Sequence, residues 1–300
     1  MASTSAGIDP VSFSLRGFAR ATAFQRRYRM DAAILLLGAP LFSRRAAGGA
    51  YASVEISGNQ GSTATALQFA AGSSPARAHG LNRFGILREA VVERTDGTEL
   101  SFAGLMTRSG EETFEQGRKA LLSRVRAAEG VVARGTTAGS TIQTWIDNIA
   151  LSPDCDWSNV NQTLGDALRR QPSEPPREIS SESAATFLHA MREAALCGEA
   201  VQHRKFTHAG KFYWLETRRQ PEHPLELIGT IHDLNGARRA EFRTAYTAGD
   251  ESGIPMRIEY RPRSFLRLTF EAELEATQPA IHSLFHEALF HEGAGQEESA

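Results

Sequence analysis

The chain has 300 residues, of which 41% are hydrophobic and 23% charged, proportions that are ordinary for a globular protein. Its 33 Lys and Arg residues oppose 35 Asp and Glu residues, and the formal charge of −2 excludes the broad basic excess of a non-specific nucleic-acid binder. The longest apolar run, residues 32–37, is much shorter than the roughly 18 residues of a membrane helix, so we expect no transmembrane segment.

The first residues are small and polar, with no charged start before an apolar stretch, so they do not form a signal peptide. The chain as given is therefore expected in the cytoplasm, whereas removal of a signal peptide would place it in the periplasm. Cys155 and Cys197 lie far apart and in no CxxC pair, which favours two thiols over a disulfide or a metal site.

The N-terminal part of the chain carries a first group of β-strand patterns. Residues 28–42 read as one buried strand, kinked at Gly38 and Pro40, and residues 50–56 and 65–71 follow as strands. Residues 84–94 and 98–106 flank Asp96-Gly97, a dipeptide typical of a β-hairpin turn.

Helical patterns occupy the middle of the chain. Apolar residues recur at helical spacing over residues 111–129, 158–170 and 181–197, and the Pro-rich residues 171–177 read as an extended polar connector.

A second group of strand patterns follows. Residues 201–207 and 211–218 flank Ala209-Gly210, and residues 225–233 and 238–246 flank Asn235-Gly236, so each pair predicts a hairpin. Residues 256–271 alternate apolar and charged side chains and predict one long strand, in which Pro262 marks an edge or a bulge. Thr277 begins a final amphipathic helix.

Short links between the strands require antiparallel neighbours. The predicted fold is mainly β (α+β): a large curved antiparallel sheet or half-barrel from two β-meanders, with a helical connector or lid and a C-terminal helix. We expect an N-terminal arm over residues 1–24, a single β domain over 25–276 with a helical insert at 111–198, and a C-terminal helix with a frayed tail over 277–300.

Standard catalytic signatures are missing from the sequence: it has no GxSxG, no GxxxxGK[ST] and no GxGxxG after a strand, so no cofactor is expected. Asp147, Asp154 and Asp156 gather near Trp157 as weak candidates for acid–base chemistry, although turn and helix-cap roles fit Asp154 and Asp156 better. His189 is a fourth weak candidate, with Glu193 one helical turn away.

Three histidines fall on the predicted C-terminal helix. His286 and His291 are five residues apart, one more than a zinc-protease motif requires, and His282 with His286 supplies only two ligands on one face. We therefore predict polar-face histidines and no metal.

A basic stripe occupies one face of residues 256–271. Arg257, Arg261, Arg263 and Arg267 share this stripe, which is suited to an anionic head group, but interleaved Glu259 and Glu271 favour a solvated, ion-paired outer face.

Apolar residues of the C-terminal strands are predicted to share the concave side of the sheet and to line a ligand site. If helices cover that side completely it is a core, and if they cover it in part it is a pocket. The predicted ligand-binding residues are Phe206, Phe212, Trp214, Ile228, Phe242, Tyr246, Ile258, Tyr260 and Leu268.

Residues 253–260 (Gly-Ile-Pro-Met-Arg-Ile-Glu-Tyr) and the helix pattern over residues 183–194, with Phe187-Leu188-His189-Ala190-Met191-Arg192, carry a resemblance. Together with the two meanders, they resemble uncharacterised bacterial envelope domains with the half-barrel of lipoprotein carriers (LolA/LolB-like). The resemblance implies binding of an apolar ligand in a concave sheet, and it transfers no catalytic residue.

The leading functional hypothesis is therefore a binding protein or carrier for an apolar or lipid-like small molecule, including one of membrane origin, with no enzymatic activity. The alternative is a cofactor-independent isomerase, cyclase or hydrolase that uses the same pocket. A third hypothesis is an interaction module that docks residues 280–291 on a partner, and the sequence leaves the oligomeric state open.

Overall fold

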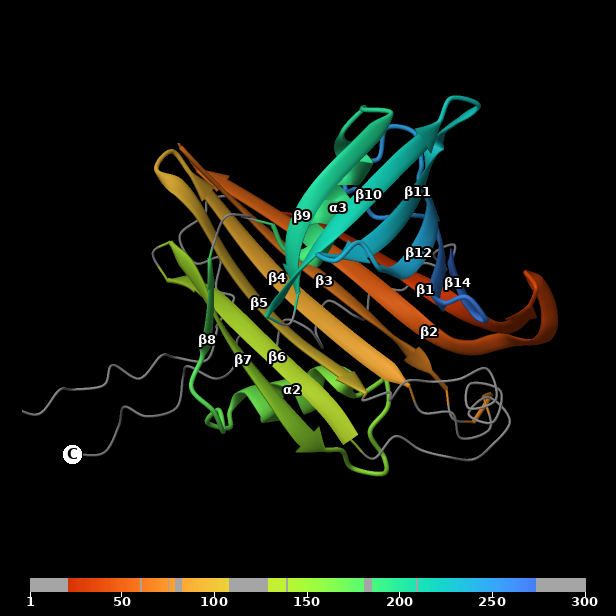
Figure 1. The fold of residues 1–300 in the computed structure, drawn as a ribbon, viewed down its shortest axis with the longest axis horizontal. Helices are drawn as coiled ribbons and strands as arrows, with labels where there is room; N and C mark the ends of the chain where they lie inside the picture. Colours follow the sequence, from red (N-terminus) through yellow and green to blue (C-terminus); the bar gives the residue numbers. More distant parts are fainter. Residues whose placement is uncertain are drawn as a thin grey trace, which may run out of the picture.

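The computed structural model describes residues 21–59, 61–74, 76–78, 83–107, 129–138, 140–180, 185–208 and 210–273 (Figure 1). These residues form fourteen strands and two helices, α2 (Val160–Leu168) and α3 (Phe187–Leu196). The strands are β1 (Ala21–Leu36), β2 (Ala39–Asn59), β3 (Ser62–Ser73), β4 (Phe84–Arg94), β5 (Gly97–Thr107), β6 (Glu129–Ala138), β7 (Thr141–Ala150), β8 (Arg177–Ser180), β9 (Val201–His208), β10 (Lys211–Gln220), β11 (His223–Asp233), β12 (Arg238–Ala245), β13 (Arg257–Arg263) and β14 (Leu266–Ala272).

All fourteen strands belong to one curved, unclosed antiparallel sheet. Its order is β8-β7-β6-β5-β4-β3-β2-β1-β14-β13-β12-β11-β10-β9, so each half is a meander and the halves meet where β1 pairs with β14. That pairing runs from Tyr28 opposite Ala272 to Ile34 opposite Leu266. The predicted mainly β fold with two meanders in one sheet is confirmed.

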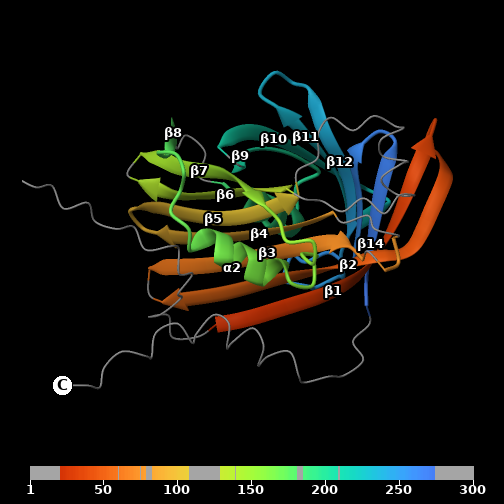
Figure 2. The same ribbon diagram turned by 90° about the horizontal axis from the view of Figure 1, so that it is seen from below.

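The two helices lie on opposite faces of the sheet. Helix α3 packs against β9 and also against β3 and β4, so it lies inside the curve of the sheet, between the two meanders (Figure 1). Helix α2 packs against β4 and β5 on the other side, in front of the sheet in Figure 2. We call the α3 side the inner face and the α2 side the outer face.

The predicted single strand over residues 28–42 is wrong. The chain turns at Leu37-Gly38, so β1 ends at Leu36 and β2 begins at Ala39. Both turn residues have positive φ, 51° for Leu37 and 84° for Gly38. Leucine rarely adopts this conformation, and a two-residue turn written Leu-Gly lacks the usual Asn or Asp signal.

The predicted long strand over residues 256–271 is likewise a hairpin, β13–β14, with Tyr260 opposite Leu268. The register of the ladder shifts between Tyr260 and Arg263, around Pro262, which cannot donate a ladder hydrogen bond. The apolar phase looked continuous because residues paired across a hairpin point to the same face.

The predicted helical insert at 111–198 contains three strands, β6, β7 and β8, which extend the N-terminal meander. Helices α2 and α3 confirm the helical patterns over 158–170 and 181–197 within the described residues. Glu129 and Gly130, expected to end a helix, begin β6. The predicted arm over residues 1–24 is wrong for residues 21–24, which begin β1. The rest of the helix predicted over residues 111–129, residues 1–20 of the arm and the C-terminal segment from residue 274, with its three histidines, lie outside the described residues.

The core is divided between the two faces. On the outer face, Val160 and Leu164 of α2 are fully buried against β3–β6. Trp157 packs over Gly49 and Gly72, where an added Cβ would come within 3 Å of the Trp157 side chain. On the inner face, one apolar cluster spans β1, β2, β3 and β14, and a second joins α3 to β9–β12.

In the described part of the chain, neither helix has the length and apolar character to cross a membrane.

Candidate ligand-binding site

Three of the predicted ligand-binding residues lie on the outer face. In β10, Leu215 points into the inner core, so its neighbour Trp214 points outward and is 42% exposed; Phe212 shares the phase of Trp214. In β11, Leu227 is the inward residue and Ile228 points outward. The predicted common face is therefore wrong for these three residues, because strand side chains alternate. The inward ones are Phe206, Phe242, Tyr246, Ile258, Tyr260 and Leu268.

The inner face of β9–β12 is a packed core. Ala190 and Ala194 of α3 are fully buried against it, and so are Phe206 and Phe242. The Phe242 ring lies directly over Gly229, where an added Cβ would come within 1.8 Å of a ring carbon. A ligand cannot enter this part of the face unless α3 moves.

A carboxylate lies in the middle of the inner face. Glu89 of β4 is 2% exposed, and its Oε2 accepts a hydrogen bond of 3.0 Å from the backbone N–H of His189 at the start of α3. Burial raises the pKa of Glu89 to about 7, although hydrogen bonds from the backbone N–H groups of residues 187–189 act in the opposite direction. Glu89 thus holds the N-terminus of α3 on the sheet.

His189 sits beside this contact. Its Nδ1 is buried and has no hydrogen-bond partner among the described residues, and burial lowers the pKa of its imidazole. Among nearby charges, Glu193 has the largest opposing effect on that pKa, followed by Glu93. His189 and Glu193 thus influence each other through charge, but no ion pair joins them among the described residues.

The acidic candidates lie on the other side of the sheet. Asp147 pairs with Val132 of the outer core, and its carboxylate accepts a 3.1 Å hydrogen bond from the backbone N–H of Ser173. Asp156 accepts a hydrogen bond from the backbone N–H of Ser158 at 2.8 Å, as expected for turn chemistry before a helix. Asp154 belongs to the same turn, in which its carbonyl accepts a hydrogen bond from Asn159. The sheet separates these carboxylates from His189, so the four candidates do not form one site.

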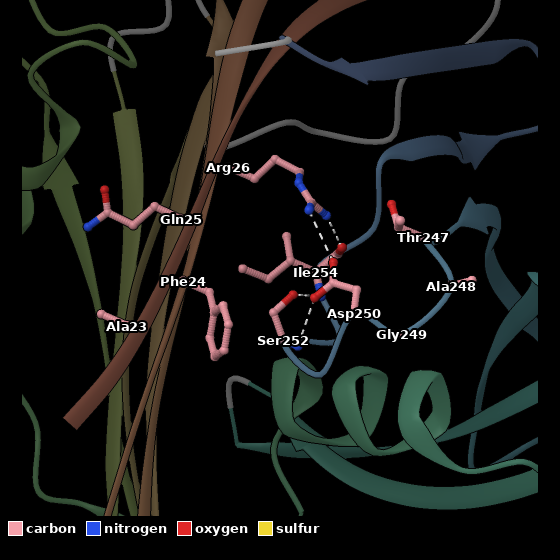
Figure 3. A pocket seen from close by; sticks show the side chains of 10 residues that line it. All are labelled: Ala23, Phe24, Gln25, Arg26, Thr247, Ala248, Gly249, Asp250, Ser252 and Ile254. Carbon is pink, nitrogen blue, oxygen red and sulfur yellow. Dashed lines mark hydrogen bonds and ion pairs between the residues drawn. The ribbon is translucent and has the colours of Figure 1, made fainter. Parts of the chain in front are cut away.

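A cavity of about 500 Å³ opens on the inner side between the start of β1 and the loop over residues 247–254 (Figure 3). Phe24 and Arg26 point from β1 toward this loop, whereas Ala23 and Gln25 point away from it. Ile254 supplies an apolar wall from the loop. Phe24 also packs against the inner cluster of β1–β3 and β14, in which several aromatic and aliphatic side chains are only partly buried.

An ion pair crosses the cavity. A guanidinium nitrogen of Arg26 lies 3.1 Å from Oδ2 of Asp250, and the same side chain donates a hydrogen bond to the carbonyl of Ile254. Burial raises the pKa of Asp250, but hydrogen bonds from Ser252 and Arg26 outweigh this effect and hold the pKa below its ordinary value. Asp250 is therefore ionised at neutral pH, in a wall that also contains the polar side chains of Thr247 and Ser252.

A second hollow of about 590 Å³ lies between the ends of the β9–β10 and β11–β12 hairpins. Its carboxylate, Asp233, is held by Arg239 at 2.6 Å and accepts hydrogen bonds from the backbone N–H groups of Asn235 and Ala237. These contacts hold the β11–β12 turn, so local turn structure explains the polar groups of this hollow.

Sequence reasoning did not find Glu89, Arg26 or Asp250. Glu89 had a detectable signal, because it falls in the apolar phase of β4 between Leu87 and Val91, where a charge is unexpected. Arg26 and Asp250 are 224 residues apart and come together only through the β1–β14 junction, so no local pattern predicts their pairing.

Both cysteines are free thiols, as the sequence favours. Within the described residues, histidine, cysteine and acidic side chains form no group of three or more that could hold a metal ion.

No protein-family model matches the chain, and no curated protein has a significant match to it. Among solved structures, a β-barrel-like protein of the domain of unknown function DUF1849 from Brucella abortus is 9% identical, with a TM-score of 0.43 over 83% of this chain and 94% of that protein. A DUF1329 family protein from Desulfovibrio piger is 11% identical, with a TM-score of 0.24 over 89% of this chain and 92% of that one. Likeness at this level identifies neither a family nor a function for the chain.

Proposed function

We propose that the protein binds an apolar or amphiphilic small molecule in the cavity between β1 and the 247–254 loop. The observation that carries the proposal is the composition of this cavity: Phe24 and Ile254 supply apolar contact, and the Arg26–Asp250 ion pair supplies a polar anchor. A volume of about 500 Å³ falls within the range of small-molecule sites, in which a few polar groups orient a ligand held mainly by apolar contact.

The neighbouring inner face offers an apolar surface that an extended chain could follow. Phe24 pairs across the sheet with Val54 of β2, which pairs with Leu67 of β3, and all three belong to or pack against the inner cluster. Ile258, Tyr260 and Leu268 are partly buried in the same cluster. We infer that the ligand lies along this strip, with its polar end at Arg26. The packed face under α3 has no part in this binding mode. The proposed site therefore lies at β1 and its neighbours, and not on β9–β12 as the sequence predicted.

The cofactor-independent enzyme receives less support from the geometry. Its acidic candidates lie on the outer face and take part in turn structure, and the Nδ1 atom of His189 is buried on the other side of the sheet. The proposed activity is therefore binding without turnover.

The proposal is tested with 11-(dansylamino)undecanoic acid, a fluorescent amphiphile with a long chain and a carboxylate. We expect wild-type protein to bind it with a rise and a blue shift of dansyl emission. Phe24→Arg places a charge inside the cavity and should weaken binding about tenfold or more, because the apolar contact is lost. Gln25→Arg is the matched control, since Gln25 borders the cavity on the same strand but its side chain points away from the loop, and it should change affinity less than twofold.

Equal binding by Phe24→Arg and Gln25→Arg, or no binding by the wild type, would contradict the proposal. Unfolding midpoints in urea verify that both variants are folded. Mass spectrometry of an organic extract of the purified protein then identifies the class of any ligand that it carries.

A further inference from the structure

The hairpin of β1 and β2 extends beyond its neighbours in the sheet. The pairing of β1 with β14 ends at Ile34, and β2 pairs with β3 only from Gly48 onward. Between these points, residues 35–47 form the projecting end, next to the β13–β14 turn, where the N–H of Leu35 donates to the carbonyl of Phe265 at 2.7 Å. Figures 1 and 2 both show this end reaching out from the rest of the sheet.

The tip of this hairpin is apolar and exposed. Leu37 is fully exposed (101%), and Leu36 and Leu41 are 52% and 56% exposed. Leu37 also occupies a left-handed backbone conformation that disfavours leucine and suits Gly or Asn. A leucine here contributes nothing to the core and strains the turn, so the requirements of folding do not explain this residue.

Arginines surround the base of the tip. Arg44 and Arg45 follow it in β2, and Arg263 and Arg267 flank the adjacent β13–β14 turn. Residues 32–46 and 260–270 contain no Asp or Glu. Arg261 is paired with Glu259 at 2.8 Å, but the other four arginines form no ion pair with another described residue.

We propose that this end of the molecule docks on a lipid bilayer rich in anionic head groups. The leucines of the tip enter the boundary between head groups and acyl chains, and the four arginines lie at the level of the phosphates. Burial of apolar side chains and attraction to anionic lipids are the two contributions that hold peripheral proteins on membranes, and both are present here within one hairpin and its neighbour. This inference does not depend on the proposed ligand.

The charge pattern decides between occupants. A second copy of the chain would bring four like-charged arginines against another four, which opposes a symmetric contact through the tip. An anionic bilayer satisfies the apolar tip and the arginines together. An acidic protein partner is the remaining occupant, and the experiment distinguishes it by the absence of vesicle binding.

The test is flotation of the full chain with vesicles. We expect binding to vesicles of phosphatidylcholine and phosphatidylglycerol (7:3), at least tenfold weaker binding to phosphatidylcholine alone, and a large loss of binding in 0.5 M salt. Leu37→Asn keeps a residue suited to the left-handed turn and removes the apolar side chain, so it should weaken binding about tenfold without unfolding the protein. Leu234→Asn is the matched control, because Leu234 is a 57% exposed leucine in another hairpin turn, and it should change binding less than twofold.

The contribution of charge is tested on β13. Arg263→Gln, next to the tip, should weaken binding about fivefold, as expected for one arginine near an anionic surface. Arg257→Gln removes a charge that is likewise exposed, at the opposite end of the same strand, and should change binding less than twofold.

Three results would overturn the proposal. The first is no binding of the wild type to anionic vesicles, which leaves an acidic protein as the occupant. The second is equal binding to the two vesicle types, and the third is equal binding by Leu37→Asn and Leu234→Asn. Circular dichroism shows whether each variant retains its sheet, so that a folding defect is not taken for a loss of docking.

Discussion

Glu89 takes the place of a side-chain cap at the start of α3. The N-cap residue, Thr186, makes no capping hydrogen bond, and the first turn of α3 contains no acidic side chain. The carboxylate that the helix N-terminus favours comes instead from β4, across the inner face. A charged side chain in the apolar phase of a strand therefore serves to dock a helix.

The burial of Glu89, which outweighs the favourable contacts with the helix N-terminus, predicts a dependence of stability on pH. The pKa of Glu89 rises from about 4.5 to about 7 on folding, so the native state binds the proton more tightly than the unfolded state does. The stabilisation is present below about pH 4.5 and is lost as the pH rises through 7. Relative to Glu89→Gln, the wild type should lose about 3 kcal/mol of its free energy of unfolding over this range.

Urea denaturation of both proteins at several values between pH 4.5 and 7.5 measures this difference. His189 and the other titrating groups are present in both proteins, so their effects largely cancel in the comparison. Parallel dependence on pH in the two proteins would show that Glu89 does not titrate in this range.

At the scale of elements, α3 is held at both ends by side chains from strands. Arg219 of β10 donates hydrogen bonds to the carbonyls of Ala194, Ala195 and Cys197, which the end of the helix leaves without intrahelical partners, and also to Pro224. The inner face therefore supplies a carboxylate to the N-terminus of α3 and a guanidinium to its C-terminus, matching the helix dipole.

Arg219→Met should lower the free energy of unfolding by about 2 kcal/mol, because charged hydrogen bonds to several buried or half-buried carbonyls are lost. The control is Arg218→Met, on the same strand but facing outward with a largely exposed side chain, which should change stability by less than about 0.5 kcal/mol. Urea denaturation at pH 7 compares them. An equal effect of the two substitutions would exclude the proposed role of Arg219.

The strands that the sequence predicts well are those with clear alternation and Gly-containing turns, such as β4–β5 around Asp96-Gly97 and β11–β12 around Asn235-Gly236. The errors arise where a turn lacks its usual residues. Leu37 hides the β1–β2 turn, and β6, rich in Gly, Thr and Ala, lacks the large apolar residues that mark a strand. Local patterns therefore identify most strands but not all of their ends.

At the scale of the whole molecule, the packing of the inner face could not be predicted. Apolar alternation shows that a face is covered, but whether side chains or a ligand cover it depends on where α3 docks. That docking joins residues about 100 positions apart, as between Glu89 and His189. The cavity at Arg26 and Asp250 depends on a still longer connection, the pairing of β1 with β14.

The same two connections predict that the halves of the sheet unfold together. Seven residue pairs join β1 to β14, and α3 packs on β9 of one meander and on β3 and β4 of the other. Separating the meanders would expose both apolar clusters of the inner face, so a half-folded state is strongly disfavoured. The tryptophans allow a direct test, since Trp145 and Trp157 report on the N-terminal half and Trp214 on the C-terminal half.

Trp214→Phe keeps the two N-terminal reporters, and the double variant Trp145→Phe/Trp157→Phe keeps the C-terminal one. In urea unfolding, the difference between the fluorescence midpoint and the circular dichroism midpoint should be the same for both variants. Fluorescence and circular dichroism should coincide within each variant, as expected for one cooperative domain over residues 25–276. Fluorescence midpoints that precede the circular dichroism midpoint in one variant and follow it in the other would mean that the meanders fold as separate units. In that case, the β1–β14 pairing and α3 would be contacts between domains, and the cavity at Arg26 would open when those domains part.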